Sequence, residues 1–215
     1  MQVKSLFKDF DELQLTHGDK SLNAIYGCGC VDSPKLCLVF MNPTAKNVSS
    51  DKNWKGIHAP WIGTKNIWKM LQQLDLISAD IAKRITAKKP SDWDEEFALE
   101  VYTEIKNKSL YITNLSKATQ IDARHLSNKD FQKYLPLLHK ELKEIKPRAI
   151  IAFGGQVSSI LLNTGIRLSE SRKKSHALLI DGHEFKVYPV FYPVGQGMRN
   201  MPVAKEDIVW ILKNS

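Results

Sequence analysis

The sequence predicts an α/β fold, a three-layer α/β/α sandwich with a mainly parallel central sheet. Short apolar segments at 35–41, 109–113 and 149–153 have the composition of buried strands, and each runs into a polar residue or a glycine. Segments with helical spacing of apolar residues lie between them. Strands that alternate with helices form parallel sheets covered on both faces, so these observations together indicate the sandwich.

The helices are expected around these strands. Apolar positions at near-helical spacing predict a helix over residues 4–15. An amphipathic pattern predicts another over 130–145, which Lys146-Pro147 ends. Thr64 has the residue type of an N-cap for a helix over 65–74. Further helical segments are expected over about 78–107, with a start at 92–96, from 154–155 to about 163, and over about 204–213.

The C-terminal part of the chain predicts a hairpin and a last strand. Residues 178–180 and 184–188 can pair across the turn at 181–182, and the last strand ends near Phe191. A loop over 192–202 follows. With 215 residues and 43% hydrophobic content, we expect residues 1–215 to form a single domain that is large enough for a three-layer core.

Composition and charge narrow the class of protein. No apolar run is long enough to cross a bilayer, and the N-terminus lacks a secretory signal, so we expect a cytoplasmic protein. A net charge of +8 favours a polyanionic partner, nucleic acid first, although the charge could also serve solubility alone.

The three cysteines do not indicate a disulfide framework or a metal site. Cys28, Cys30 and Cys37 are an odd number in a chain expected to be cytoplasmic. Cys28-Gly29-Cys30 resembles half of a metal site, but no second pair of soft ligands follows. We therefore expect no metal and no cofactor.

The strand over 35–41 runs directly into an Asn-Pro turn. Proline fixes its own φ and keeps the preceding residue out of the α region, so Asn42 is held at the carboxyl end of the strand. Other marked residues end other strands: Asn114, Gly154-Gly155 and the 192–200 loop. Each has an ordinary explanation as a turn or a cap. Because the carboxyl ends of parallel strands share one edge, their joint placement predicts a cleft.

Five segments of the chain, taken in sequence order, resemble the motifs of the uracil-DNA glycosylase superfamily. The resemblance runs from about residue 26 to the C-terminus. Segment 40–44 is similar to the first motif, which reads Gly-x-Asn-Pro-Gly in the mismatch-specific and single-strand-selective families. Segment 60–69 resembles the part that carries the base-stacking aromatic, and 111–117 resembles the strand whose last Asn reads uracil. Segments 146–154 and 192–202 are similar to the phosphate-contacting turn and to the loop that inserts into the duplex.

The resemblance implies a DNA glycosylase that removes uracil or a related deaminated base by base flipping and leaves an abasic site. Asn42 would orient the attacking water, and Tyr192 stands where most families have the His that supports the leaving base. Trp61 would stack on the flipped base and Asn114 would read its edge, with Met41 beside them. The enzyme would act on DNA as a monomer, near the nucleoid.

Three groups of residues are implied in DNA contacts. Backbone N–H groups at helix starts would hold phosphates, a wedge would fill the gap left by the base, and a basic run would supply salt-dependent attraction. The basic run could equally be a solvated loop. The phosphate-holding residues would be Thr64, Gly154 and Gly155, and the wedge would be Met198 with Arg199. The basic run includes Arg172 and Lys173.

The chain also departs from the family pattern. Phe40 and Thr44 stand in place of the two motif glycines, and Tyr192 replaces the His. Lys117 is followed by Ala118 instead of the Cys of the iron–sulfur families, so no cluster is expected. The missing glycines and Tyr192 favour one alternative, a non-catalytic nucleic-acid-binding protein of the same fold. A separate alternative is an α/β enzyme for a small nucleotide substrate, with a cleft closed to duplexes.

Overall fold

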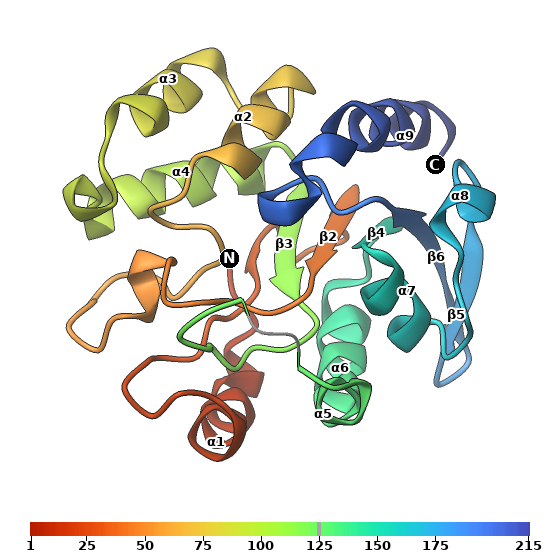
Figure 1. Ribbon diagram of the computed structural model, residues 1–215, viewed down its shortest axis with the longest axis horizontal. Coiled ribbons are helices and arrows are strands. Elements are labelled where there is room, and N and C mark those ends of the chain that lie inside the picture. Colours follow the sequence, from red (N-terminus) through yellow and green to blue (C-terminus); the bar gives the residue numbers. More distant parts are fainter. Residues whose placement is uncertain (124–125) are drawn as a thin grey trace.

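The computed structural model describes residues 1–123 and 126–215, and within them a six-stranded sheet forms the centre of the molecule (Figure 1). The strand order is β1-β3-β2-β4-β6-β5. Strands β2, β3, β4 and β6 are parallel, while β1 and β5 pair antiparallel at the two edges. The strands are β1 (Cys28–Gly29), β2 (Leu36–Phe40), β3 (Leu110–Asn114), β4 (Ala149–Phe153), β5 (His176–Ile180) and β6 (His183–Val190).

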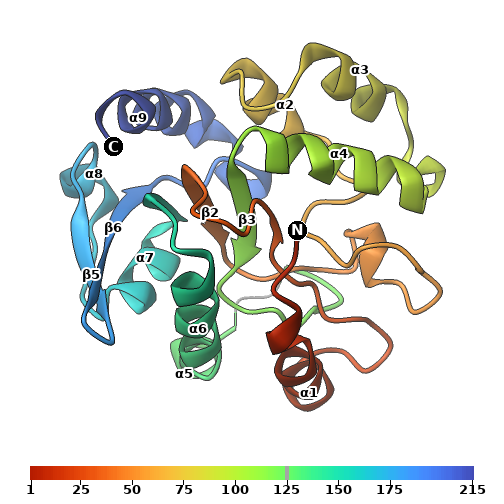
Figure 2. The same cartoon turned by 180° about the vertical axis from the view of Figure 1, so that it is seen from behind.

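Helices cover both faces of this sheet, as Figures 1 and 2 show from opposite sides. On one face, α2 (Asn66–Gln73), α3 (Ala79–Ala87), α4 (Glu95–Asn107) and α9 (Met201–Asn214) contribute to one hydrophobic cluster. On the other, α1 (Phe7–His17), α5 (Asn128–Gln132), α6 (Leu135–Ile145) and α7 (Gly155–Leu161) contribute to a second. The predicted three-layer α/β/α class is confirmed. Shorter elements are α8 (Leu168–Ser171) and the 3-10 helices η1 (Lys4–Leu6), η2 (Val48–Ser50), η3 (Pro90–Asp92) and η4 (Gly195–Asn200).

The central strands are buried on both faces, which is why they read as continuous apolar runs in the sequence. Every residue of β2, β3 and β4 is buried. Side chains alternate along β2, so Leu38 and Phe40 join the first cluster whereas Val39 joins the second. Phe40 is paired in register with Asn114, the last residue of β3. The side chains of Phe40 and Asn114 therefore point to the same face of the sheet.

One helix prediction was wrong in detail. The expected helix over 130–145 is split into α5 and α6, and Pro136 lies in the first turn of α6. Proline has no N–H and is tolerated in a first turn but not in a helix interior, so a continuous helix is excluded there. The helical region expected over 78–107 contains α3 and α4, with Pro90 at the start of η3 between them.

Helix starts followed the sequence more closely where an acidic cap was present. The predicted start at 92–96 is confirmed, because the Asp94 side chain accepts a hydrogen bond of 2.7 Å from the Phe97 N–H. The Thr64 prediction was wrong: α2 begins after Lys65, and the Thr64 hydroxyl instead donates to the Trp61 carbonyl. The predicted 178–188 hairpin is present as β5 and β6. Helix α9 begins at Met201, so the 192–202 loop is partly helical.

The cysteines are free thiols. Cys28 and Cys37 are buried, and burial raises the pKa of both thiols. Within the described ranges, no group of His, Cys, Asp or Glu side chains is placed to hold a metal ion. Among these same residues no helix has the length and apolar character needed to span a bilayer.

Gly63, two residues after Trp61, tests how closely the surrounding loop is packed. Gly63 has φ +84°, and a Cβ there would lie 2.3 Å from Val48 Cγ2. We expect Gly63→Ala to lower the free energy of unfolding by about 1–3 kcal/mol in urea titration, because the left-handed backbone and the clash both add strain. Gly165→Ala is the matched control, since a Cβ at Gly165 meets nothing within 4 Å. Equal effects of the two substitutions would contradict the prediction.

Candidate active site

The loops that follow β2 and β3 are joined by backbone hydrogen bonds. The Leu115 N–H donates to Phe40 O at 2.7 Å, and the Ser116 N–H donates to Met41 O at 3.0 Å. Further along, Gln120 donates to Pro43 O and accepts from the Ala45 N–H. The loop that carries Asn42 is therefore fixed against the loop that begins at Asn114, as the shared-edge argument predicts.

The two asparagines have different degrees of access. Asn42 is half-buried, and its Nδ2 donates to the Pro43 carbonyl at 3.2 Å. Asn114 is 3% exposed and belongs to the end of a central strand. A buried amide on a rigid strand is suited to recognition by fixed hydrogen bonds, whereas a half-buried amide on a turn can reach a solvent molecule.

Trp61 has an unusual backbone. Its φ is +66°, a region that bulky residues rarely adopt. Three donors hold its carbonyl in place: the Thr64 N–H, the Thr64 hydroxyl and the Trp68 indole N–H. Its own Nε1 is buried without a hydrogen-bond partner among the residues that the structure describes. Backbone strain and an unsatisfied donor both occur more often at functional sites than elsewhere.

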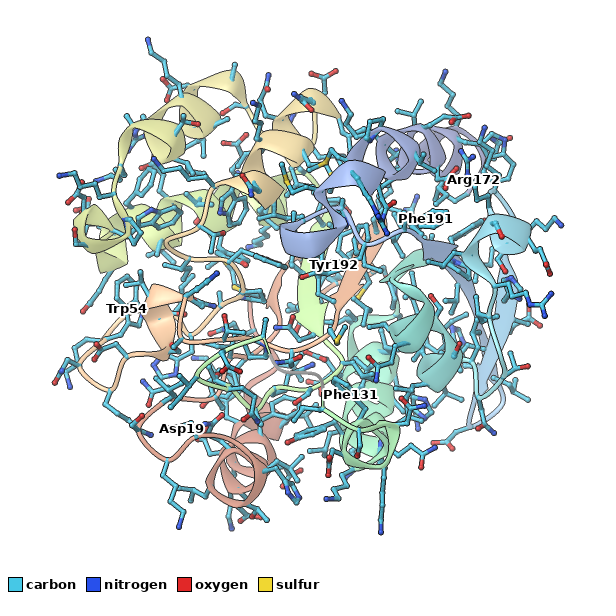
Figure 3. All side chains as sticks on the ribbon, viewed as in Figure 1. Asp19, Trp54, Phe131, Arg172, Phe191 and Tyr192 are labelled. Carbon is cyan, nitrogen blue, oxygen red and sulfur yellow. The ribbon has the colours of Figure 1, made fainter. Side chains whose placement is uncertain are left out.

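The Phe40 ring lies at the centre of an aromatic group. It stacks on Phe153 with ring centroids 4.4 Å apart and meets Trp61 edge-on at 4.9 Å. The Tyr192 ring lies 6.3 Å from it, also edge-on. Phe40, which stands in place of a motif glycine, is fully buried and contacts all three of the other rings. Figure 3 shows Tyr192 near the middle of the molecule.

Tyr192 is held by close backbone packing. A Cβ at Gly197 would lie 2.1 Å from the Tyr192 carbonyl oxygen, and a Cβ at Gly154 would lie 3.7 Å from Tyr192 Cβ. Burial raises the pKa of the Tyr192 phenol to about 12. The hydroxyl therefore keeps its proton at neutral pH and can act as a hydrogen-bond donor.

The backbone N–H groups expected to hold phosphates are mostly occupied. The Thr64 N–H donates to Trp61 O at 3.1 Å, and the Gly154 N–H donates to Val190 O at 2.8 Å. Neither is free to bind a phosphate, which corrects that expectation. Gly155 is the first residue of α7, where helix geometry provides no intrahelical acceptor for its N–H.

The two basic residues expected to attract DNA form ion pairs with acidic residues of α9. Arg172 Nε lies 3.0 Å from Oδ1 of the buried Asp207, and Arg172 Nη2 lies 2.8 Å from Glu206 Oε2. Lys173 pairs with the same Glu206. Figure 3 shows Arg172 at the margin of the molecule, beside α9. This segment therefore fastens α9 to α8, whereas Met198, which is 46% exposed, and the exposed Arg199 face solvent on η4.

Two hollows in the structure lie away from these residues. One of about 580 Å³ lies between α3 and α4, and one of about 730 Å³ is lined by the rings of Phe7, Tyr26 and His58. Neither is lined by Asn42, Trp61 or Asn114. The strand ends thus meet as predicted, but around an aromatic group and not around either of these hollows.

A buried ion pair next to Asn114 was not found by sequence reasoning. Lys117 Nζ lies 2.7 Å from Glu141 Oε2, and both side chains are 1% exposed. The signal was present, because Glu141 follows Leu138 by three residues and precedes Leu142, so it lies on the apolar stripe of α6.

A family comparison agrees with this geometry. The model of the uracil DNA glycosylase superfamily matches residues 27–210, most of the chain. The chain belongs to the uracil-DNA glycosylase superfamily. The matched range includes the strands β1 to β6 and the candidate site residues Asn42, Trp61, Asn114 and Tyr192. No curated protein matches the sequence. Membership in the uracil-DNA glycosylase superfamily supports a glycosylase-type role in DNA repair, with DNA as the partner.

Two tyrosines with raised pKa values predict a loss of stability at alkaline pH. Burial raises the pKa of Tyr134 and Tyr192 to about 12, above the ordinary value of about 10. The unfolded chain releases these protons near pH ~10, while the folded chain keeps them, so rising pH favours the unfolded state. We expect the stability that the two protonated phenols contribute to be fully present below pH ~10 and lost as pH rises toward ~12. Urea titrations across this range, read with phenolate absorbance, test it, and Tyr192→Phe should flatten the dependence.

Proposed function

We propose that the protein hydrolyses the N-glycosidic bond of uracil or a related deaminated base in DNA and leaves an abasic site. The observation that supports this most is the joining of the Asn42 and Asn114 loops beside the Phe40, Trp61 and Tyr192 rings. We further propose that residues 1–215 form a single domain that acts as a cytoplasmic monomer.

Base recognition would depend on Trp61 and Asn114. A flipped base needs a flat apolar partner, and base–aromatic stacking is worth roughly 1–3 kcal/mol. Uracil presents an N–H donor beside carbonyl acceptors, which the Asn114 amide can match and which cytosine does not offer in the same order. Met41, which follows Phe40 directly, would border the base.

Bond cleavage would depend on Asn42 and Tyr192. The sugar becomes cationic as the base departs with negative charge, so fixed donors at the base matter more than a strong nucleophile. Asn42 would orient the attacking water, since an amide is too weakly basic to take its proton early. The protonated Tyr192 hydroxyl would donate to the leaving base.

DNA would be held by the loop after β6 and by dispersed basic residues. Met198 offers an apolar wedge and Arg199 a cation next to it, both exposed on η4. Gly155 would contribute a backbone N–H to a phosphate. Arg172 and Lys173 have a smaller part in this proposal than the sequence suggested, because acidic side chains neutralise them.

Product analysis on a panel of oligonucleotides tests the proposed activity. Duplexes and single strands that carry uracil, hypoxanthine or mismatched thymine are incubated with the protein and then cleaved with alkali at abasic sites. Cleavage of at least one substrate, absent for the matched undamaged strand, supports the proposal. Intact strands in every case would reject it.

A non-catalytic DNA-binding protein of the same fold is the second candidate. Phe40 in place of a motif glycine favours it, because its buried ring occupies space beside Asn114. Tight binding to uracil-containing DNA without turnover, unaffected by Asn42→Ala, would establish this reading instead.

The salt dependence of DNA binding separates the two basic segments. We expect Arg199→Ala to reduce the slope of log K against log salt concentration by about 1, because an exposed cation releases a counterion from DNA. Lys173→Ala is the matched comparison and should change the slope less, since Glu206 pairs with Lys173. Fluorescence anisotropy with an undamaged duplex gives both slopes. A larger effect at Lys173 would contradict the assignment.

A further inference from the structure

A lysine and a glutamate are buried together on the face of the sheet opposite the Asn114 side chain. Lys117 lies three residues after the end of β3, and Glu141 lies on the inner side of α6. Their side chains are each 1% exposed. Removing two charges from water is costly, so such a pair persists only where its hydrogen bonds are well satisfied.

The ammonium group of Lys117 has three N–H donors, and three acceptor atoms surround it. These acceptors are Glu141 Oε2 at 2.7 Å, Thr113 Oγ1 at 2.7 Å and the main-chain oxygen of Asn114 at 2.5 Å. The Glu141 carboxylate also accepts from the Tyr111 hydroxyl at 2.8 Å and from the Thr113 hydroxyl. Every charged group of the cluster is therefore hydrogen-bonded.

The peptide group between Asn114 and Leu115 is held at both of its polar atoms. Its carbonyl oxygen accepts from Lys117 Nζ, and its N–H donates to Phe40 O at 2.7 Å. The peptide plane cannot turn without breaking one of these bonds. Because this plane sets the direction in which the Asn114 side chain leaves the backbone, the ion pair acts on that side chain without touching it.

The same lysine is itself fixed at its backbone. The Ile25 N–H donates to Lys117 O at 3.0 Å, so the 115–120 loop is held at its middle. That loop carries the hydrogen bonds to Met41 O and Pro43 O, on either side of Asn42. A displacement of Lys117 would thus reach both asparagines of the candidate site.

We propose that Lys117 and Glu141 are a positioning pair, which fixes the Asn114 peptide and through it the amide that reads the base. What Asn114 reads rests on the proposed function. The pair touches neither base nor sugar, because Thr113 and Lys117 belong to one face of the sheet while Asn114 shares the other face with Phe40.

The variant Lys117→Met/Glu141→Gln removes both charges together, with a Gln of the same length as Glu141 and a Met one atom shorter than Lys117. We expect single-turnover excision of uracil to slow by the order of 100-fold, because small misplacements of a recognising group have effects of that size. Affinity for undamaged duplex should stay within about twofold, since phosphate contacts are untouched. Amide hydrogen exchange at Leu115 and Ser116 should accelerate relative to β4.

Ile85→Ala is the matched control for lost stability. Ile85 is a buried residue of α3 and belongs to the hydrophobic cluster on one face of the sheet, whereas Lys117 pairs with Glu141 of α6 on the other face. The proposal is overturned if Ile85→Ala, compared at equal fraction folded, slows excision as much as the charge-free variant does. Wild-type excision by the charge-free variant would overturn it as well.

A milder variant covers the case in which the charge-free protein does not fold. Thr113→Val takes one acceptor from Lys117 Nζ and leaves the ion pair in place. We expect a 2- to 10-fold slower excision, about the value of one hydrogen bond. Unchanged excision together with unchanged exchange at Leu115 would count against the positioning role.

The exchange measurement and a binding measurement keep this inference separate from the proposed activity. If the wild-type protein cleaves no substrate, the glycosylase proposal fails. The ratio of affinities for a duplex with a non-hydrolysable deoxyuridine analogue and for undamaged duplex still reports how Asn114 is held. A ratio that is the same in the wild type and in the charge-free variant would then overturn the positioning role.

Discussion

Asn42→Ala is expected to slow single-turnover base excision by about 10²–10³-fold while DNA affinity changes by no more than about threefold. Removal of one fixed hydrogen-bonding group at a reacting centre has effects of this size on the chemical step. Asn42 lies on a turn that the Met41 and Pro43 carbonyls fasten to the 115–120 loop, so the substitution should leave the surrounding backbone in place. Rapid-quench kinetics and anisotropy titration measure the two quantities.

Asn107→Ala is the control for this experiment. Asn107 is exposed at the end of α4, shortly before β3 begins, and therefore lies at the sheet edge opposite Asn114. Its removal should change neither rate nor affinity. Equal losses of rate and affinity in Asn42→Ala would reject the water-orienting role, because a residue that only orients the water acts on the chemical step and not on the binding of DNA.

Lys117→Met is expected to lower the free energy of unfolding by about 3–5 kcal/mol. The substitution leaves the Glu141 carboxylate buried without its cation, and breaking a buried pair in this way is among the most destabilising single changes. Lys117→Met/Glu141→Gln should recover much of the loss, since no unpaired charge remains. Urea unfolding followed by tryptophan fluorescence measures both variants.

Lys143→Met provides the comparison on the surface. Lys143 pairs with Asp181, but their side chains are 44% and 74% exposed. Water compensates both groups there, so we expect a change of less than about 1 kcal/mol. If the two lysine variants lost similar stability, the burial of the Lys117 pair could not be the cause of its effect.

The sequence was most informative where a local pattern decides the structure. The strands β2, β3 and β4 are continuous apolar runs because both of their faces are covered. Their positions could therefore be predicted from the sequence to within a residue or two. Asn42 and Asn114 were found for the same reason, since each ends such a run. The common edge of parallel strands then brought them together without any knowledge of coordinates.

The sequence was least informative where the partner of a residue lies far along the chain. Arg172 looked like a free cation, but its partner Asp207 is 35 residues away on α9. Lys117 looked like a motif residue, although its partner Glu141 is 24 residues away on α6. Thr64 had the type of an N-cap, and only the left-handed turn at Trp61 gave its hydroxyl another acceptor.

The strand order has a consequence for how the molecule is made. Strand β6 lies between β4 and β5, so the sheet is incomplete until residues 183–190 have left the ribosome. Tyr192 follows that strand, whereas Asn42 is synthesised some 150 residues earlier. Contacts over such separations form slowly, and a nascent chain exposes the unpaired edge of β4 in the meantime. The tyrosine that borders the candidate site is thus added only after the strands β1 to β6 have been translated.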